Sequence, residues 1–373
     1  MSSKKVELAG IFRQYGPAYL EKYGERMLPS HKRAMQDIID CRTEELGGQV
    51  YFCQPCDDYR YSYHSCKNRN CNKCGNDQAT EWLKQQRHRL LPVTHFLVTF
   101  TLHDHLRQLA RSNQKIIYHL LFQASAAALQ KLARDPKFVG GELAMMGVLQ
   151  TWTRDLLFHP HVHYVVPGGG LSADGSQWLS ARNNFLVPVK ALSKIFRAKF
   201  RDALKKTELF KRVPPQTWKQ AWVVHSEPVG SGEMALEYLA KYIFRIALSN
   251  KRLVKLEDGK VTFQYQHAKT GQTKTKTLPA LEFMHDFLQH VLPLRFVKVR
   301  YYGLWSPTKR ELLEKAQTLL GVKLTKAERK PQAELGEATD NSEPPKLCCP
   351  KCGHLMRWVK ELPSKRKGRS PPC

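Results

Sequence analysis

The period of the hydrophobic positions changes several times along the chain, and each stretch of constant period predicts one element. Apolar residues three and four apart are typical of helices, and short runs of β-branched and aromatic residues are typical of strands. Helices are expected within residues 1–40 and at 79–91, 104–134, 189–204, 233–248 and 280–291. Strands are expected at residues 94–102, 143–152, 158–166, 221–225, 261–265, 273–278 and 296–301. This mixture predicts an α+β protein.

Two segments lack any such period. Residues 41–75 are rich in Cys, Gly, Asn, Tyr and Arg, a composition typical of a small module held by a metal ion. Residues beyond 323 are rich in Lys, Glu, Pro and Asn, which predicts a linker, and a basic, Pro-rich end follows it.

The charge of the chain indicates its class of partner. Sixty Lys and Arg face 33 Asp and Glu, a formal net charge of +27, and the basic residues are dispersed along the chain. Such an excess favours a polyanion, and DNA binding and generic RNA binding both fit it. No apolar run reaches the ~18–20 residues of a membrane span, and the first twenty residues are too polar for a signal peptide. We therefore expect a soluble, cytoplasmic protein.

The cysteines predict a structural zinc site. Cys53-x2-Cys56 and Cys71-x2-Cys74 are separated by 14 residues, close to the spacing of a four-cysteine site. Two residues between thiolates allow both sulfurs to reach one tetrahedral ion at about 2.3 Å. Basic residues around these cysteines favour contact with nucleic acid, although a solvated charged surface would also explain them.

The remaining cysteines leave alternatives open. Cys66 either replaces one of the four ligands or shares a second ion with Cys41 and His64. Near the C-terminus, Cys349-x2-Cys352 forms half of a zinc ribbon, and we interpret it as a partial or vestigial knuckle. Its missing half would need Cys348, His354 or Cys373.

The segment His159-Pro-His161-Val-His163 favours a divalent metal site. Side chains alternate between the two faces of a strand, so His161 and His163 share one face. Two imidazoles on one face can bind one ion together with a third polar ligand. A pair of histidines on a hydrated sheet face is the simpler interpretation. Two enzyme classes use related strings: the histidine-triad nucleotide hydrolases and the His-hydrophobic-His (HUH) nucleases.

A tyrosine pair separates these two classes. Tyr238 and Tyr242 are four residues apart in an expected helix, so both phenols lie on one face, where a core stripe is the alternative interpretation. An HUH nuclease combines histidines on a strand with nucleophilic tyrosines on a helix. A histidine-triad hydrolase needs no tyrosine. Lys241 could stabilise the phosphorane or lower the pKa of a tyrosine.

These motifs together resemble the HUH-type, two-tyrosine rolling-circle transposases of the insertion-sequence-91 family. The resemblance extends over roughly residues 7–310. It rests on the cysteine-rich segments at 46–56 and 65–74, HPHVH at 159–163 with VPGGG at 166–170, YLAKY at 238–242 with IALSN at 246–250, HVLP at 290–293, and YYGL at 301–304.

The resemblance implies an antiparallel HUH sheet flanked by helices and preceded by a small zinc-knuckle domain. It implies a bacterial enzyme, associated with the nucleoid, that nicks single-stranded DNA at element ends, becomes attached to the 5′ phosphate and transfers the strand to a target. Mg²⁺ or Mn²⁺ would serve the HUH site and Zn²⁺ the knuckle. A plasmid replication initiator or relaxase, or a non-catalytic zinc-ribbon DNA-binding protein, is the alternative.

Residue roles carry over position by position. His161 and His163 would bind the catalytic metal, Tyr238 and Tyr242 would be the nucleophiles, and the zinc would be held by Cys53, Cys56, Cys66, Cys71 and Cys74. Gln150 stands where the family has a histidine, which leaves Gln150, His159 or His225 as third metal ligand. The expected organisation is a helical zinc-binding domain (1–92), a connecting strand and helix (93–139), the catalytic domain (140–310), a linker (311–347) and a basic tail with a partial knuckle (348–373).

Overall fold

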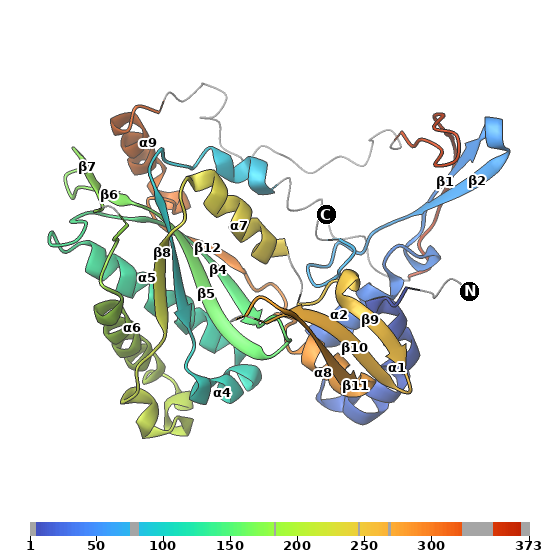
Figure 1. Cartoon of the computed structure of the whole chain (residues 1–373), viewed down its shortest axis with the longest axis horizontal. Coiled ribbons are helices and arrows are strands. Elements are labelled where there is room, and N and C mark those ends of the chain that lie inside the picture. The colour runs from blue at the N-terminus through green and yellow to red at the C-terminus, as the bar shows by residue number, and fades with distance from the viewer. Residues whose placement is uncertain are drawn as a thin grey trace.

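The computed structural model describes residues 5–74, 82–182, 184–244, 247–267, 270–322 and 346–366. Figure 1 shows two parts: a large sheet covered by helices on the left, and a group of helices with a smaller sheet on the right. A long hairpin projects from the second part. Across the described residues, no helix has both the length and the apolar character needed to cross a membrane.

A five-stranded sheet forms the centre of the larger part. Its strand order is β12-β4-β5-β3-β8, and every neighbouring pair is antiparallel. This confirms the expected mixture of helices with an antiparallel sheet. The strands are β3 (His95–Thr101), β4 (Ala144–Trp152), β5 (Phe158–Pro167), β8 (Val224–Pro228) and β12 (Val299–Gly303), and a separate ribbon pairs β6 (Gly169–Leu171) with β7 (Trp178–Ser180).

Alternation along the central strand β5 sends its side chains into two cores. Val162 and Tyr164 pack against the helices of one face, whereas Val165 packs against those of the other. The first face is covered by α4 (Arg107–Ser112), α5 (Gln114–Ala133) and α6 (Val189–Leu204). The second face is covered by α7 (Gly232–Phe244) and α9 (Arg310–Leu319). His161 and His163 share the parity of Val165, so they belong to the face under α7.

The second part joins the N-terminus to a late segment of the chain. The ring of Phe12 packs edge-on against that of Phe287, with centroids 5.5 Å apart. This core is therefore shared between the expected domains 1–92 and 140–310. Its elements are α1 (Leu8–Tyr23), α2 (Pro29–Asp40), β9 (Leu253–Glu257), β10 (Lys260–Gln266), β11 (Thr273–Pro279) and α8 (Ala280–Leu288).

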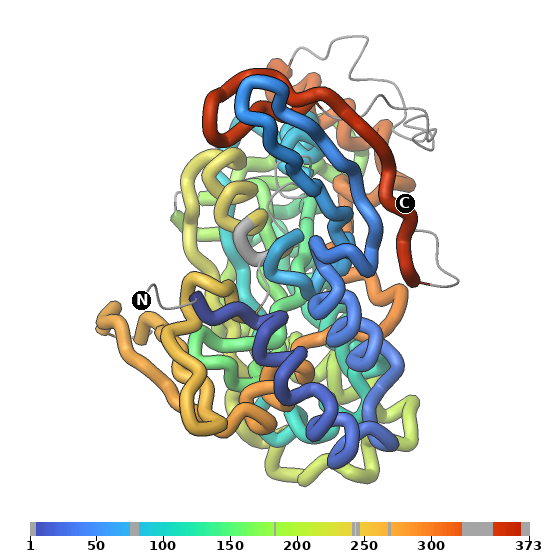
Figure 2. The backbone as a smooth tube through the Cα atoms, turned by 90° about the vertical axis from the view of Figure 1, so that its right-hand side faces the viewer, coloured from blue at the N-terminus to red at the C-terminus, as the bar shows by residue number. Residues whose placement is uncertain are grey.

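The projecting hairpin binds the C-terminal segment. Strands β1 (Gly48–Cys53) and β2 (Asp58–Tyr63) form the hairpin, and β13 (Arg357–Leu362) pairs antiparallel with the free edge of β1. Figure 2 shows this C-terminal segment, in red, running alongside the blue hairpin. The segment expected to be a tail is therefore part of an ordered three-stranded sheet.

Two expectations about helices need correction. The helix expected at 104–134 is interrupted at Asn113, whose φ of −135° and ψ of 42° are not helical. The linker expected at 311–347 begins with α9 instead, because Leu312, Leu313 and Ala316 pack into the core on the α7 face. Residues 323–345 of that linker lie outside the described residues.

Candidate active site

The register of the central strands brings four polar side chains together on the α7 face. Gln150 of β4 is paired with His161 of β5, and His163 is paired with Thr99 of β3. Directly cross-strand partners point to the same face of a sheet. Gln150, His161, His163 and Thr99 are thus neighbours, and Thr101, which is paired with His161, adjoins them.

One oxygen lies between the two imidazoles. Oε1 of Gln150 is 3.1 Å from Nε2 of His161 and 3.1 Å from Nε2 of His163. Nδ1 of His161 lies 2.6 Å from the carbonyl oxygen of His159. Because a carbonyl can only accept, Nδ1 carries the proton, and Nε2 of the neutral ring presents a lone pair toward Gln150. Nδ1 of His163 is likewise held by Oγ1 of Thr99 at 2.9 Å.

Burial keeps both rings uncharged. It lowers the pKa of His161 well below the ordinary value, and the neighbouring His163 lowers it further. Burial also lowers the pKa of His163 to about 4. Neutral imidazole is the form that binds metal ions, and two imidazoles with an amide oxygen suit a divalent cation. The residues present therefore fit the metal that the sequence motif implies.

The three candidates for a third ligand differ in position. Gln150 contacts both histidines as described. His159 contributes its backbone carbonyl to His161, and its own ring lies 5.4 Å from the ring of His161, centroid to centroid. His225 is exposed on β8 and pairs with Glu227 at 3.3 Å. The geometry thus favours Gln150.

Helix α7 crosses the same face and carries the tyrosines. Ala235, Leu236 and Leu239 are buried against the sheet, and Tyr238 is partly buried in the same cluster. Lys241 and Tyr242 belong to α7 by their backbone. Their side chains lie outside the described residues.

The C-terminal end of α7 reaches the histidine end of the sheet. Nζ of Lys298 donates to the carbonyl oxygen of Ile243 at 3.0 Å, and the carbonyl of Lys298 accepts from the backbone N–H of Leu149 at 3.1 Å. Since Ile243 follows Tyr242 and Leu149 precedes Gln150, Lys298 bridges the two halves of the site. Burial lowers the pKa of the Lys298 ammonium to about 7, and nearby Arg69 contributes to this shift.

The sequence did not single out Thr99 or Lys298. Two threonines, Thr99 and Thr101, interrupt the apolar run of β3 on the histidine face, which was an available signal. No such signal marks Lys298 in the sequence, because its burial depends on the packing of Trp152, whose ring lies 5.0 Å from the ammonium.

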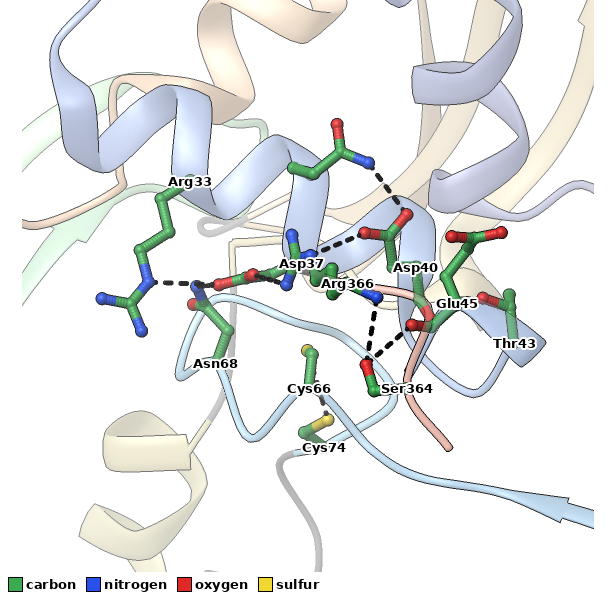
Figure 3. A network of polar contacts seen from close by, with 11 residues as sticks. Arg33, Asp37, Asp40, Thr43, Glu45, Cys66, Asn68, Cys74, Ser364 and Arg366 are labelled. Atoms are coloured by element: carbon green, nitrogen blue, oxygen red, sulfur yellow. Dashed lines mark hydrogen bonds and ion pairs between the residues drawn. The ribbon is translucent and has the colours of Figure 1, made fainter. Parts of the chain in front are cut away.

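Four cysteines cluster beside α2, and we call them the N-terminal cluster. Sγ of Cys74 lies 3.5 Å from that of Cys41 and 3.7 Å from that of Cys66, and Cys71 completes the group. Figure 3 shows Cys66 and Cys74 beneath the polar residues of α2. All four cysteines are buried, and all four sulfurs lie within 4.8 Å of one another.

The expected grouping of the cysteines needs correction. Cys53 and Cys56 do not join Cys71 and Cys74, because β1 and β2 carry the first pair away along the projecting hairpin. They lie instead with Cys349 and Cys352, in what we call the split cluster. The half-site of Cys349 and Cys352 is therefore completed by Cys53 and Cys56 and is not a vestigial knuckle.

Comparisons with known proteins identify two matched regions in the chain. Residues 144–312 match a family model described as "Putative transposase", and residues 11–102 match one described as "Transposase zinc-binding domain". A "Putative transposase y4qJ" of Sinorhizobium fredii is 38% identical in an alignment of 343 positions that covers 86% of each chain. The transposase for insertion sequence element IS801 of Pseudomonas savastanoi is 28% identical over 287 residues, 71% of this chain and 68% of that one. No solved structure matches.

The matches define a transposase with a zinc-binding domain. The chain belongs to the insertion-sequence-91 family of transposases, as its sequence motifs indicated. Structural zinc accords with both the domain match and the cysteine clusters.

Proposed function

We propose that this transposase cuts and rejoins single-stranded DNA through a phosphotyrosine intermediate, as in rolling-circle transposition. The observation that carries the proposal is the convergence of Gln150, His161 and His163 on the sheet face that α7 covers. A helix with two tyrosines beside a site for a divalent cation is the set of groups that this chemistry needs.

In this proposal Gln150, His161 and His163 hold Mg²⁺ or Mn²⁺. The bound ion would polarise the scissile phosphate and offset the negative charge of the transition state. The carbonyl of His159 fixes the tautomer and orientation of the His161 ring, and the hydroxyl of Thr99 orients the ring of His163. The burial of the rings keeps them free of competing protons at neutral pH.

Tyr238 and Tyr242 are the proposed nucleophiles. A phenolic oxygen attacks the phosphorus and loses its proton, while the bond from phosphorus to the 3′ oxygen breaks and that oxygen leaves as a hydroxyl. The product is a 5′-phosphotyrosine, so the phosphodiester energy is retained. A 3′ hydroxyl of another strand can then reverse the step and release the tyrosine. Lys241, between the tyrosines, is proposed to stabilise the charge on phosphorus.

The charge of the chain suits the substrate. A net charge of +27 favours association with the phosphate backbone. A pocket beside the histidine end of the sheet includes Arg69 and Lys298 in its lining, so cationic groups lie near the proposed site. The initiator or relaxase interpretation uses the same chemistry but is not favoured, because both relatives described above are named transposases.

A denaturing gel tests the proposal. Purified protein, Mn²⁺ and single-stranded oligonucleotides from the sequences flanking the gene are combined, with the label on the 3′ side of the cut. The label should migrate with the wild-type protein. It should remain free with the variants Tyr238→Phe/Tyr242→Phe and His161→Ala/His163→Ala.

A matched control is Tyr265→Phe, which removes a phenol from β10 in the second part of the molecule. It should form the adduct at the wild-type level. An adduct that persists in the double tyrosine variant would overturn the proposed nucleophiles. Salt-sensitive DNA binding with no adduct on any strand would leave a non-catalytic DNA-binding protein.

A further inference from the structure

The split cluster has the geometry of a metal site. Cys53 and Cys352 are 299 positions apart, yet their Sγ atoms lie 3.5 Å apart, and those of Cys56 and Cys349 lie 4.0 Å apart. A tetrahedron with metal–sulfur distances of ~2.3 Å has edges of roughly 3.8 Å between sulfurs. A disulfide would need ~2.05 Å. The spacing therefore suits four thiolates around one ion, and it matches the 3.5–3.7 Å of the N-terminal cluster.

The two cysteine pairs are presented by similar turns. Asp57 follows Cys56 with a φ of 48°, and Gly353 follows Cys352 with a φ of 76°. Each turn thus enters the left-handed region directly after its second cysteine, which aims both sulfurs of a pair inward. Across the cluster, Nζ of Lys351 pairs with Oδ2 of Asp58 at 2.7 Å.

The apolar core around this cluster is very small. Among the described residues its buried members are Tyr51, Cys53, Cys349 and Met356. A core of this size contributes little stability, and natural modules of this scale generally depend on disulfides or a metal ion. Without an ion at this end, few apolar contacts would stabilise the pairing of β13 with β1.

We infer that the split cluster is a second structural zinc site, built jointly by the N-terminal hairpin and the C-terminal segment. The zinc-binding domain match ends at residue 102 and therefore excludes Cys349 and Cys352. Thiolate ligands select zinc over the harder Mg²⁺ and Mn²⁺, so this ion is distinct from the one proposed for the histidine site.

This second zinc fixes a segment that supports the first cluster. Beyond β13, Arg366 bonds to the carboxylates of Asp37 and Asp40 on α2. Nδ2 of Asn68, from the loop of the N-terminal cluster, donates to the same Asp37 at 2.8 Å. Figure 3 shows these contacts converging on α2. The C-terminal segment thus completes the zinc-binding domain.

The test is the zinc content of the full-length protein, measured by plasma mass spectrometry after dialysis. The wild type should hold two zinc ions per chain. Cys53→Ser/Cys56→Ser and Cys349→Ser/Cys352→Ser should each hold one, and the variant that combines all four changes should also hold one. Only a shared site gives this pattern, because two separate sites would lose two ions in the combined variant.

Cys348→Ser is the matched control, because Cys348 adjoins Cys349 but is exposed and stands outside the cluster. It should keep two zinc ions. Limited digestion with trypsin is a second readout. In Cys349→Ser/Cys352→Ser, trypsin should cleave after Lys351, Arg357 and Lys360, whereas the central sheet should stay resistant to cleavage. One zinc in the wild type, or two in the Cys349→Ser/Cys352→Ser variant, would overturn the inference.

Discussion

Nε2 of His163 lies 3.1 Å from Oε1 of Gln150 on the neighbouring strand. The same oxygen lies 3.1 Å from Nε2 of His161, whose proton is on the opposite nitrogen. The lone pair on Nε2 of His161 and Oε1 of Gln150 are two acceptors that face each other and repel, and a cation between them turns this repulsion into coordination. The arrangement therefore makes Gln150 as important to the proposed metal site as the histidines of the motif.

Replacing Gln150 by Leu should weaken Mn²⁺ binding by at least ~10–100-fold, since loss of a supporting contact alone costs that much. Electron paramagnetic resonance of Mn²⁺ measures this without disturbing zinc, because Mn²⁺ does not compete for thiolates. His225→Ala, an exposed change on the same sheet, should bind as wild type. If wild type binds no Mn²⁺, the amide NH₂ of Gln150 faces the rings and the site is a plain hydrogen-bond network.

Thr99→Val should reduce Mn²⁺ affinity by ~10-fold, because the hydroxyl of Thr99 holds Nδ1 of His163 at 2.9 Å. The same titration measures it. Thr262→Val is the matched control: it removes the hydroxyl that bonds Thr277 in the smaller sheet, far along the chain from the histidines. Equal losses in both variants would show a general effect of lost hydrogen bonds and contradict a positioning role for Thr99.

Local periodicity predicted the elements whose apolar residues repeat regularly within the segment itself, whatever that segment packs against. Helix α6 has the expected bounds of 189–204, because Leu192, Phe196, Phe200 and Leu204 repeat every four residues. The strands β1, β2 and β13 were not expected. Their outward positions are polar or aromatic, β1 and β2 pair with each other in a local hairpin, and β13 pairs with β1 from about 300 residues away.

The same limit applies to the candidate site. A period of two placed His161 and His163 on one face, but the choice of Gln150 over His225 required the register of β4 against β5. Cysteine spacing suggested one site for Cys53 and Cys71. The spacing of cysteines in the sequence gives no information about the hairpin that carries Cys53 and Cys56 toward Cys349.

Lys298 gives a prediction on pH. Burial lowers its pKa from 10.5 to about 7, so between about pH 7 and pH 10.5 the unfolded chain holds a proton that the folded chain lacks. Stability conferred at this position therefore rises with pH across that window and is constant below about pH 7, where both states hold the proton. The unfolding free energy of the wild type, relative to that of Lys298→Met, should therefore increase as the pH increases. Urea titrations at several pH values measure it, and a constant difference would contradict the lowered pKa.

Arg366 gives a prediction on stability. Its guanidinium contacts Asp37 at 2.7 Å and Asp40 at 3.1 Å, and the two carboxylates are only 5% and 6% exposed. Removing Arg366 leaves two buried, closely spaced acids. Of these, Asp37 keeps its ion pair with Arg33 at 3.5 Å, and burial already raises the pKa of Asp40. Arg366→Gln should therefore cost about 3 kcal/mol, the low end for a broken buried pair because the arginine is partly exposed.

Urea unfolding followed by tryptophan fluorescence, to which Trp358 on β13 contributes, measures the effect of Arg366→Gln. The adjacent variant Lys365→Gln removes the same charge from an exposed pair with Glu44 and should leave the midpoint unchanged. If both variants shift the midpoint equally, net charge explains the loss. A shift confined to Arg366→Gln means that the C-terminal segment is held to α2 by this buried contact.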